Sequence, residues 1–463
     1  MSDNLALLFR SVAITRLVAG LIIYGSAFIE LDRTTLVAQT PESQSVPPVK
    51  ENASLSKLHP ERVENGLRVA TFNVSLHRKR TGALTTDLRG EDQQARAVAS
   101  VIRAVRPDII LLNELDYSEA DDNAALFAER FLADAKLDLL GSLPWPMPYV
   151  YSAPVNTGMP SGLDQNGNGK STDPEDAWGF GQFPGQYGMA VLSRFPIDRA
   201  QVRSFQKLKW ANMPGARVPR DPDTGKTYYA DDVWSQLRLS SKSFWDVPIQ
   251  TPLGLVSLLA SHPTPPAFDG PADHNGCRNH DEIRMLVDYV EAAIKVETNV
   301  EAKVETKVET KVETKTIASG AEYLIDDQGT VGGIGRDRSF VIVGDLNSDP
   351  IDGASQHLAI ERLLTSASVA AADAPTSRGA IVAAREQAKA NREHQGPAER
   401  DTADFFDGTV GNLRVDYVVP SKRFEVVASG VFWPDVTELP EHRAIVKKLL
   451  EASDHHLVWI DIR

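Results

Sequence analysis

Side chains that can bind a cation or move a proton recur along this sequence at the ends of short apolar segments. Five such clusters are Thr71-Phe72-Asn73, Leu112-Asn113-Glu114, Ala260-Ser261-His262, Gly344-Asp345-Leu346-Asn347 and Ser453-Asp454-His455, and Asp416 lies inside a sixth segment. Carboxylate and amide oxygens are preferred ligands of hard divalent cations, and imidazole exchanges protons near neutral pH. Taken singly, each cluster has an ordinary interpretation, as a turn former, a solvated carboxylate or a locally bonded histidine. Taken together, they predict a site that combines a cation with acid–base groups.

The elements that must position these side chains are short strands separated by helices. The apolar patterns predict strands at residues 67–73, 109–112, 189–192, 255–260, 340–343, 415–419 and 456–462. Helical spacing of Ala and Val predicts a helix over residues 91–105, which Pro107 stops. Strands with interspersed helices indicate a layered α/β domain, and open α/β sheets build their sites at strand ends.

In this order the clusters resemble the endonuclease/exonuclease/phosphatase superfamily, which includes DNase I-like nucleases, abasic-site endonucleases, inositol polyphosphate phosphatases and neutral sphingomyelinases. The T-F-N, N-E, G-D-L-N and S-D-H motifs match, and Gly188 to Pro196 resembles the family pattern G-x-A-x-L-S-R-x-P. The resemblance covers roughly residues 66–463. It implies a DNase I-like fold, a four-layer α/β/β/α sandwich with two central mixed sheets.

The resemblance also implies a divalent-metal-dependent phosphoesterase. Such an enzyme hydrolyses a phosphodiester or phosphomonoester by in-line attack of water, and cations neutralise the phosphoryl oxygens. The implied cofactor is Mg²⁺ or Mn²⁺. Its expected ligands are Glu114, the best candidate, with Asn73 and Asp454.

By the same resemblance, five residues are expected to be catalytic. Asp416 would fix the tautomer of His455, so that the imidazole orients or deprotonates the attacking water. Asp345 would position and activate that water, and Asn347 would donate its amide N–H to a phosphoryl oxygen. His262 would donate to the charge that develops in the transition state, although a cap of the proline-rich turn that follows it is an alternative.

A second cation is suggested by one loop in residues 162–178. Asp164, Asn166, Asn168, Gly169 and Glu175 match the spacing D-x-[DN]-x-[DN]-G-x5-E, which places oxygen ligands around a glycine turn. Prolines and glycines on either side break the flanking helices of an EF-hand. The segment is therefore interpreted either as a structural Ca²⁺ loop or as a turn rich in Gly and Asn.

Two groups of basic residues were weighed as further anion contacts. His274, Arg278 and His280 follow the His262 strand and would either bind a phosphate outside the central site or cap a helix. Lys207, Lys209, Arg217, Arg220 and Trp210 form a mixed patch that could track a nucleic-acid strand.

Composition limits the classes of function and of partner that the chain can have. The chain has 463 residues, a formal net charge of -14 and one cysteine, Cys277, which excludes internal disulfides and cysteine-based zinc sites. An acidic body disfavours non-specific binding of polyanions unless bound cations mediate the contact. The expected partner is a phosphate ester, either nucleic acid or a small-molecule or lipid-headgroup phosphoester, with no obligate protein partner evident. A catalytically silent binding module of the same fold is the alternative from another class.

The N-terminal region indicates export. Arg10 and Arg16 precede an uncharged apolar run at residues 17–29, so residues 1–38 are expected to be a signal peptide or an N-terminal anchor. Residues 39–65 are expected to be a linker, and residues 66–463 the catalytic domain. The protein would then be periplasmic, extracellular or membrane-anchored at the outer face. A low-complexity insertion with a V-E-T-K repeat, at about residues 295–336, is expected to have no chemistry of its own.

Overall fold

The computed structural model describes residues 55–292, 320–335 and 337–463. All of these described residues belong to one compact unit. The expected leader, residues 1–38, and the V-E-T-K repeat lie outside the described residues. None of the helices within the described ranges has both the length and the apolar character needed to span a membrane.

Two mixed β-sheets form the centre of the domain. In the six-stranded sheet β1 and β2 are parallel and the other pairs are antiparallel; its order is β12 (Val426–Val431), β13 (Val458–Ile462), β1 (Leu67–Asn73), β2 (Ile109–Asn113), β4 (Met189–Ser193) and β3 (Tyr149–Tyr151). In the five-stranded sheet β7 and β8 are parallel; its order is β11 (Asp416–Pro420), β8 (Ser339–Asp345), β7 (Gly254–Ser261), β6 (Phe244–Thr251) and β5 (Arg203–Ser204). A short ribbon pairs β9 (Ala403–Asp404) with β10 (Asn412–Leu413).

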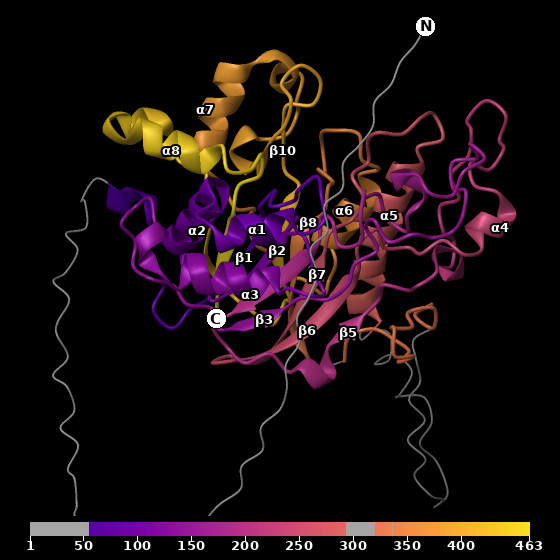
Figure 1. Cartoon of the computed structure of the whole chain (residues 1–463), viewed down its shortest axis with the longest axis horizontal. Coiled ribbons are helices and arrows are strands. Elements are labelled where there is room, and N and C mark those ends of the chain that lie inside the picture. Colours follow the sequence, from indigo (N-terminus) through magenta and orange to yellow (C-terminus); the bar gives the residue numbers. More distant parts are fainter. Residues whose placement is uncertain (1–54, 293–319, 336) are drawn as a thin grey trace, which may run out of the picture. The chain divides into compact units, whose positions relative to one another are not determined.

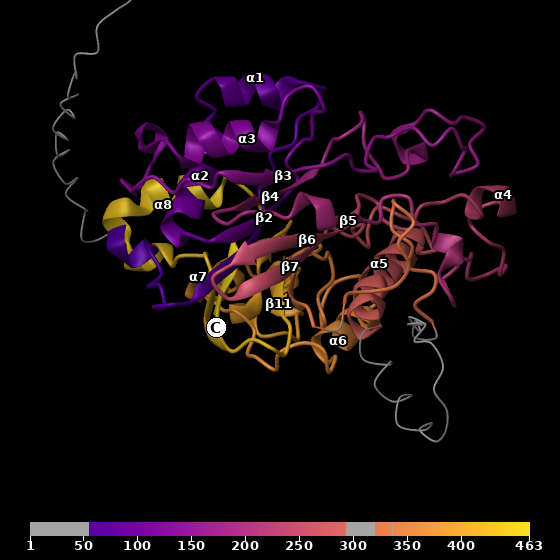
Figure 2. The ribbon, with the colours of Figure 1, turned by 90° about the horizontal axis from the view of Figure 1, so that it is seen from below.

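Helices cover the outer face of each sheet, and Figure 2 shows the resulting layers edge-on. One helical layer packs on the six-stranded sheet and comprises α1 (Ala83–Arg89), α2 (Gln93–Val105), α3 (Asn123–Phe127) and α8 (Arg443–Leu450). On the other sheet lie α5 (His274–Glu291) and α6 (Leu358–Leu364). The short α4 (Asp231–Trp234) and α7 (Arg378–Gln387) belong to the connections (Figure 1). The predicted α/β/β/α sandwich with two mixed sheets is confirmed.

Three apolar cores explain the sequence patterns of the strands. One core lies between the two sheets, and the other two lie between each sheet and its helices. Every residue of β1 and of β2 is buried, because these strands have a sheet on one face and helices on the other. Strands buried on both faces are expected to be continuously apolar, which made Ile109–Asn113 easy to recognise.

The structure corrects two predicted boundaries. Residues 55–65, assigned to a linker, contact the domain: Leu55 and Leu58 are buried in the helical core, and Arg62 pairs with Asp108 at 2.5 Å. Residues 320–335, assigned to the low-complexity insertion, also belong to the domain, because Leu324 is fully buried in the core beside α5. In both places the apolar residues follow no helix or strand period, so the sequence pattern does not predict this packing.

Candidate active site

The two sheets pack face to face, and the ends of their central strands lie close together, where they gather the predicted catalytic residues. Asn73 ends β1 beside Asn113 of β2, and Asp345 ends β8 directly opposite Asp416 of β11. The Asn113 amide joins the sheets: its oxygen accepts from the Asp345 N–H at 3.3 Å, and its nitrogen donates to the Ser261 carbonyl at 3.4 Å. Asn113 belongs to the N-E motif, and no sequence pattern predicts that it bridges the two sheets.

Asp345 is the centre of a buried array of polar side chains. The Asn73 amide donates to its Oδ2 at 3.0 Å. The same oxygen lies 3.4 Å from His262 Nε2 and 3.7 Å from His455 Nε2. Both imidazoles and Asp345 are almost wholly inaccessible to solvent. The sequence clusters at residues 73, 262, 345 and 455 therefore converge on one carboxylate.

Asp416 fixes the other side of the His455 ring. Its Oδ2 lies 2.9 Å from His455 Nδ1, and it accepts a second hydrogen bond from the Thr402 hydroxyl at 2.8 Å. Phe405 meets the His455 ring edge-on, with centroids 5.4 Å apart. The imidazole is thus held on three sides, and Nε2 faces Asp345.

The charges in this array depend on each other. Burial opposes a charge on His455, but the carboxylates of Asp416 and Asp345 raise the pKa of His455 well above its ordinary value. Burial likewise opposes ionisation of Asp345, yet His455 and His262 lower the pKa of that carboxyl below its ordinary value. Burial and the Lys242 charge lower the pKa of His262. The array therefore favours an ionised Asp345, a proton on His455 and a neutral His262.

The predicted metal ligands lie at the same edge of the sheets. Glu114 directly follows β2 in a left-handed conformation, with φ 58°, and its side chain is 22% exposed. Asp454 is exposed, and its Oδ1 accepts from the Ser75 hydroxyl at 3.3 Å. The Asn73 oxygen accepts from the Ser75 N–H at 3.2 Å. All three side chains offer oxygen atoms as metal ligands, and those of Glu114 and Asp454 can be reached from solvent. Such a set suits a hard divalent cation.

A second group has the spacing of a metal site. Ligand atoms of Asp345, Asp416 and His455 lie within 4.8 Å of one another. The Asp416 carboxylate is already hydrogen-bonded to His455, and a cation there would replace the proton that this short contact requires. This group therefore has the geometry of an acid–base array as well as the spacing of a cation site.

Asn347 is next to the array, but its amide is engaged. Its backbone has a left-handed conformation, φ 51°, and its N–H donates to Asp345 Oδ1 at 2.9 Å. The side-chain Nδ2 donates to the Pro263 carbonyl at 3.1 Å. One amide hydrogen remains for a phosphoryl oxygen, so the predicted role is compatible with this position.

Lys242 is a charged residue of the site that the sequence analysis missed. It precedes β6, is 5% exposed, and lines the same cavity as Glu114. Burial lowers the pKa of Lys242, while Glu282, Glu114 and Asp345 favour its charge. A buried cation among carboxylates at a cavity wall is suited to an anionic substrate. In the sequence, Lys242 follows two serines and precedes β6, a strand that the apolar pattern did not predict.

The proposed calcium loop uses its oxygens internally. Asp164 accepts from the N–H groups of Asn168, at 3.1 Å, and Gly169, at 2.8 Å. The Asn166 oxygen also accepts from Asn168 N–H, at 3.0 Å. Glu175 lines the cavity that Glu114 and Lys242 share. These are the hydrogen bonds of a tight turn, and a structural Ca²⁺ stays a prediction.

The additional basic residues have mainly structural contacts. Arg278 donates to the carbonyls of Leu239, Trp178 and Arg238, and His280 contacts Asp281 at 3.0 Å.

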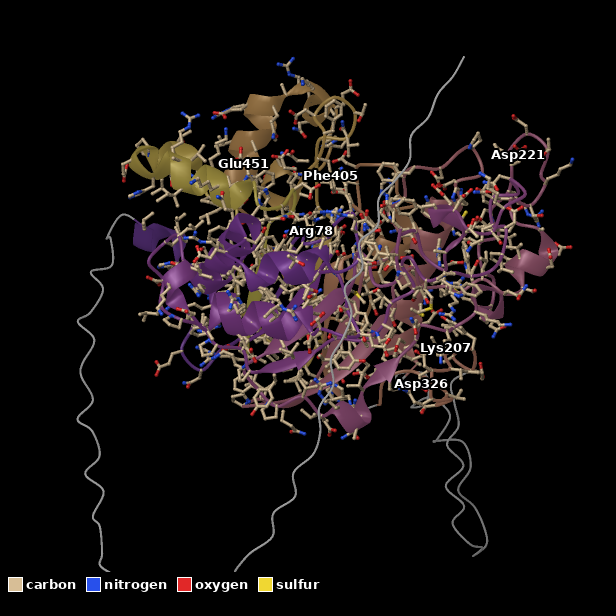
Figure 3. All side chains as sticks on the ribbon, viewed as in Figure 1. Arg78, Lys207, Asp221, Asp326, Phe405 and Glu451 are labelled. Atoms are coloured by element: carbon tan, nitrogen blue, oxygen red, sulfur yellow. The ribbon has the colours of Figure 1, made fainter. Side chains whose placement is uncertain are left out.

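The patch that could track a nucleic-acid strand lacks its aromatic member on the surface. Trp210 is fully buried, and its indole donates to Asp281 at 2.8 Å. Lys207 is exposed on the surface close to Asp326 (Figure 3).

Comparison with known proteins identifies the family of the chain. The sequence model of the Endonuclease/Exonuclease/phosphatase family matches residues 70–455, which span β1 to His455. The chain belongs to this family. Members of the Endonuclease/Exonuclease/phosphatase family hydrolyse phosphoesters with a divalent metal, so the chain is an enzyme rather than a silent module. No curated protein matches it.

Solved structures with similar folds include three of different description. An endonuclease/exonuclease/phosphatase from Beutenbergia cavernae is 20% identical, with 86% of this chain and 71% of that chain covered and a TM-score of 0.43. Sphingomyelinase C from Streptomyces griseocarneus is 17% identical, with 86% and 99% covered and a TM-score of 0.39. The human Nocturnin catalytic domain with bound sulfate is 12% identical, with 86% and 93% covered and a TM-score of 0.38.

Proposed function

We propose that the chain hydrolyses a phosphodiester or phosphomonoester by in-line attack of water, with Mg²⁺ or Mn²⁺ as cofactor. One observation supports this most strongly: the Asp416–His455–Asp345 array, with His262, is buried next to a cavity wall that carries Glu114 and Lys242. This arrangement pairs a proton acceptor with cationic groups, as attack on an anionic ester requires.

Each residue of the array has a separate role in the proposed reaction. Asp345, which is ionised, accepts a hydrogen bond from the attacking water and takes its proton, and the protonated His455 ring, held by Asp416, stabilises the Asp345 charge. His262, neutral and hydrogen-bonding, donates toward the phosphoryl oxygens, and Lys242 offsets their charge. Oriented donors of this kind commonly contribute two to three orders of magnitude in rate, roughly 10²–10³-fold.

The cofactor would be held by Glu114, with Asn73 and Asp454 in support. When bound, a divalent cation neutralises phosphoryl charge and stabilises the leaving oxygen. The fit rests on the donor set described above, which is all oxygen and partly exposed beside the cavity.

Between the two substrate classes, a small-molecule or lipid-headgroup ester is favoured over nucleic acid. The patch expected to follow a strand lacks its aromatic residue, because Trp210 is buried. The net charge of -14 also repels a polyanion.

Purified protein assayed with bis(p-nitrophenyl) phosphate, plasmid DNA and phosphatidylinositol phosphates, with Mg²⁺ or Mn²⁺, tests this proposal. We expect metal-dependent release of p-nitrophenol and slow or no nicking of DNA. No hydrolysis of any ester with either metal would overturn the proposed function, and preferred hydrolysis of plasmid DNA would overturn the substrate preference.

We also propose that the protein is exported, on the basis of the basic and apolar pattern of residues 10–29. Fractionation of cells that express the full chain tests this. Recovery only from the cytoplasm would contradict it.

A further inference from the structure

His77 lies beside Glu114 and has no role in the chemistry described so far. Its ring nitrogen Nε2 is 3.5 Å from Glu114 Oε2, and the two side chains are 36% and 22% exposed. This distance is longer than an ordinary hydrogen bond, in which nitrogen and oxygen are roughly 2.7–3.2 Å apart. The two groups therefore face each other without a hydrogen bond between them, at a place that solvent can reach.

The segment that follows β1 brings His77 to this place. Val74 and Leu76 are fully buried in the core between the six-stranded sheet and its helices, whereas Ser75 and His77 are partly exposed. The Val74 N–H donates to the Asn113 carbonyl at 3.0 Å, so the backbone stays next to the end of β2. Burial of alternate residues in the core thus holds the imidazole beside the residues that follow β2.

The same short segment, residues 73–77, contacts the other expected ligands of the cation. Asn73 is its first residue, and the Asn73 side-chain oxygen accepts from the Ser75 N–H at 3.2 Å. The Ser75 hydroxyl donates to Asp454 Oδ1 at 3.3 Å. His77 at the end of the segment faces Glu114. The imidazole therefore belongs to the same group of side chains as the three oxygen ligands.

The His77 ring is held in its orientation. It packs against the Tyr187 ring, with centroids 4.6 Å apart and planes inclined at 47°. The next residue, Arg78 (Figure 3), is fixed through its N–H, which donates to Asp116 Oδ2 at 2.8 Å, and through its side chain, which pairs with Asp87 at 2.6 Å. A side chain that is already ordered loses less conformational entropy when it binds a ligand.

An imidazole changes which cation such a site prefers. Mg²⁺ takes oxygen ligands, whereas imidazole is a common ligand of first-row transition ions. Two ligand atoms about 2.1 Å from one ion and at right angles to each other lie roughly 3 Å apart, so Nε2 and Oε2 need to approach by only about 0.5 Å to share an ion. An ion pair between these exposed side chains would by itself stabilise the fold little.

We propose that His77 is a ligand of the cation that Glu114 holds, and that this nitrogen donor makes the site prefer Mn²⁺ to Mg²⁺. This assignment rests on the proposed function and adds one nitrogen to the oxygen ligands named there. His77 lies four residues beyond Asn73, in a segment without strand or helix periodicity, so no sequence motif indicates its role.

Pulsed electron paramagnetic resonance of Mn²⁺ bound to the full chain tests the ligand directly. We expect a nitrogen hyperfine coupling from a coordinated imidazole in the natural protein. His77→Asn, which offers an oxygen in place of the nitrogen, should lose this coupling. His394→Ala, which removes an imidazole bonded to the Val410 carbonyl, is the matched control and should keep it. A coupling that is unchanged in His77→Asn would come from another imidazole and would overturn the proposal.

Calorimetric titration with Mn²⁺ and with Mg²⁺ measures the preference. We expect the ratio of the Mn²⁺ affinity to the Mg²⁺ affinity to fall about tenfold in His77→Asn and to stay the same in His394→Ala. An unchanged ratio in the folded His77→Asn variant would contradict the assignment. Neither measurement needs turnover. Mn²⁺ bound without a nitrogen coupling would refute this inference alone, whereas no binding of either ion would also refute the cation site of the proposed function.

Discussion

Asp345 is the residue on which the site depends. Its Oδ2 is approached by Asn73, His262 and His455 from β1, β7 and the segment before β13. A buried carboxylate is costly unless its charge is compensated, and here hydrogen bonds and cationic groups do so. The result is an ionised group at the bottom of the site at neutral pH.

Lys242 provides a test at the scale of one residue. Lys242→Met keeps the length of the side chain but removes the charge that faces Glu114 and Asp345. We expect kcat/KM for bis(p-nitrophenyl) phosphate to fall roughly 10²-fold, because the developing phosphoryl charge loses a cation. Lys207→Met, on the surface, is the control (Figure 3). A folded Lys242→Met enzyme with the activity of that control would contradict the role.

The site residues that the sequence predicts lie next to strong strand patterns, and those that it does not predict lack such a pattern. Asn73, Glu114, Asp345 and His455 end or precede strands with strong apolar patterns, and their motifs were recognisable. Lys242 precedes β6, where Pro248 and polar residues mask the strand pattern. The contact between Asn113 and Asp345 is set by how two sheets pack, which no local pattern encodes.

At the scale of elements, one long connection packs into the core of the domain. Residues 320–335 are rich in glycine, yet Tyr323, Leu324 and Ile334 are buried beside α5, and Asp326 pairs with Arg203 at 2.7 Å. Burial of three apolar side chains anchors a segment that composition alone assigned to an insertion. The V-E-T-K repeat precedes this segment in the sequence.

These two neighbouring segments should respond differently to change. Replacing residues 296–315 with a Gly/Ser linker of equal length should leave kcat and the thermal midpoint almost unchanged, because the repeat carries no predicted chemistry. Leu324→Ala should lower the free energy of unfolding by about 2–5 kcal/mol, as expected for a truncated core residue. Denaturant unfolding and turnover measure both. Loss of turnover on replacing the repeat would refute its assignment.

The connection near β9 contains a pH-dependent element. Burial and the neighbouring carboxylates of Asp349, Asp352 and Glu399 raise the pKa of Asp401 to about 8. A folded-state pKa above the unfolded value stabilises the fold at low pH, and this contribution is lost as the pH rises toward 8. Asp401→Asn should therefore melt at a higher temperature than the natural protein by a margin that grows from pH 5 to pH 8. A constant margin across this range would contradict the shift.

At the scale of the whole molecule, one domain brings together residues from Asn73 to His455. Its acidity is compatible with a metal-bridged anionic substrate and unfavourable for binding along a nucleic acid. The fold class was predictable because each layer has a clear apolar pattern. The cavity was not, because its wall comes from two irregular segments that meet only in the folded chain.

Removal of the metal tests the whole site. Chelation with EDTA should abolish turnover, and Mg²⁺ or Mn²⁺ should restore it. Glu114→Gln should weaken Mn²⁺ binding, measured by calorimetry, at least about tenfold, since it removes the principal charged ligand. Asp221→Asn, on an exposed loop, is the matched control (Figure 3). Full activity in EDTA would contradict metal dependence.

The most direct test of the catalytic centre is the turnover of bis(p-nitrophenyl) phosphate by the His455→Ala variant with Mg²⁺ or Mn²⁺ present. Because His455 lies between Asp416 and Asp345 and, in our proposal, stabilises the Asp345 carboxylate that activates the water, we expect kcat to fall roughly 10²–10⁴-fold with the fold intact. His394→Ala, which removes an imidazole bonded to the Val410 carbonyl, should retain its activity. Turnover by His455→Ala at the level of the natural protein would contradict the assignment of this centre.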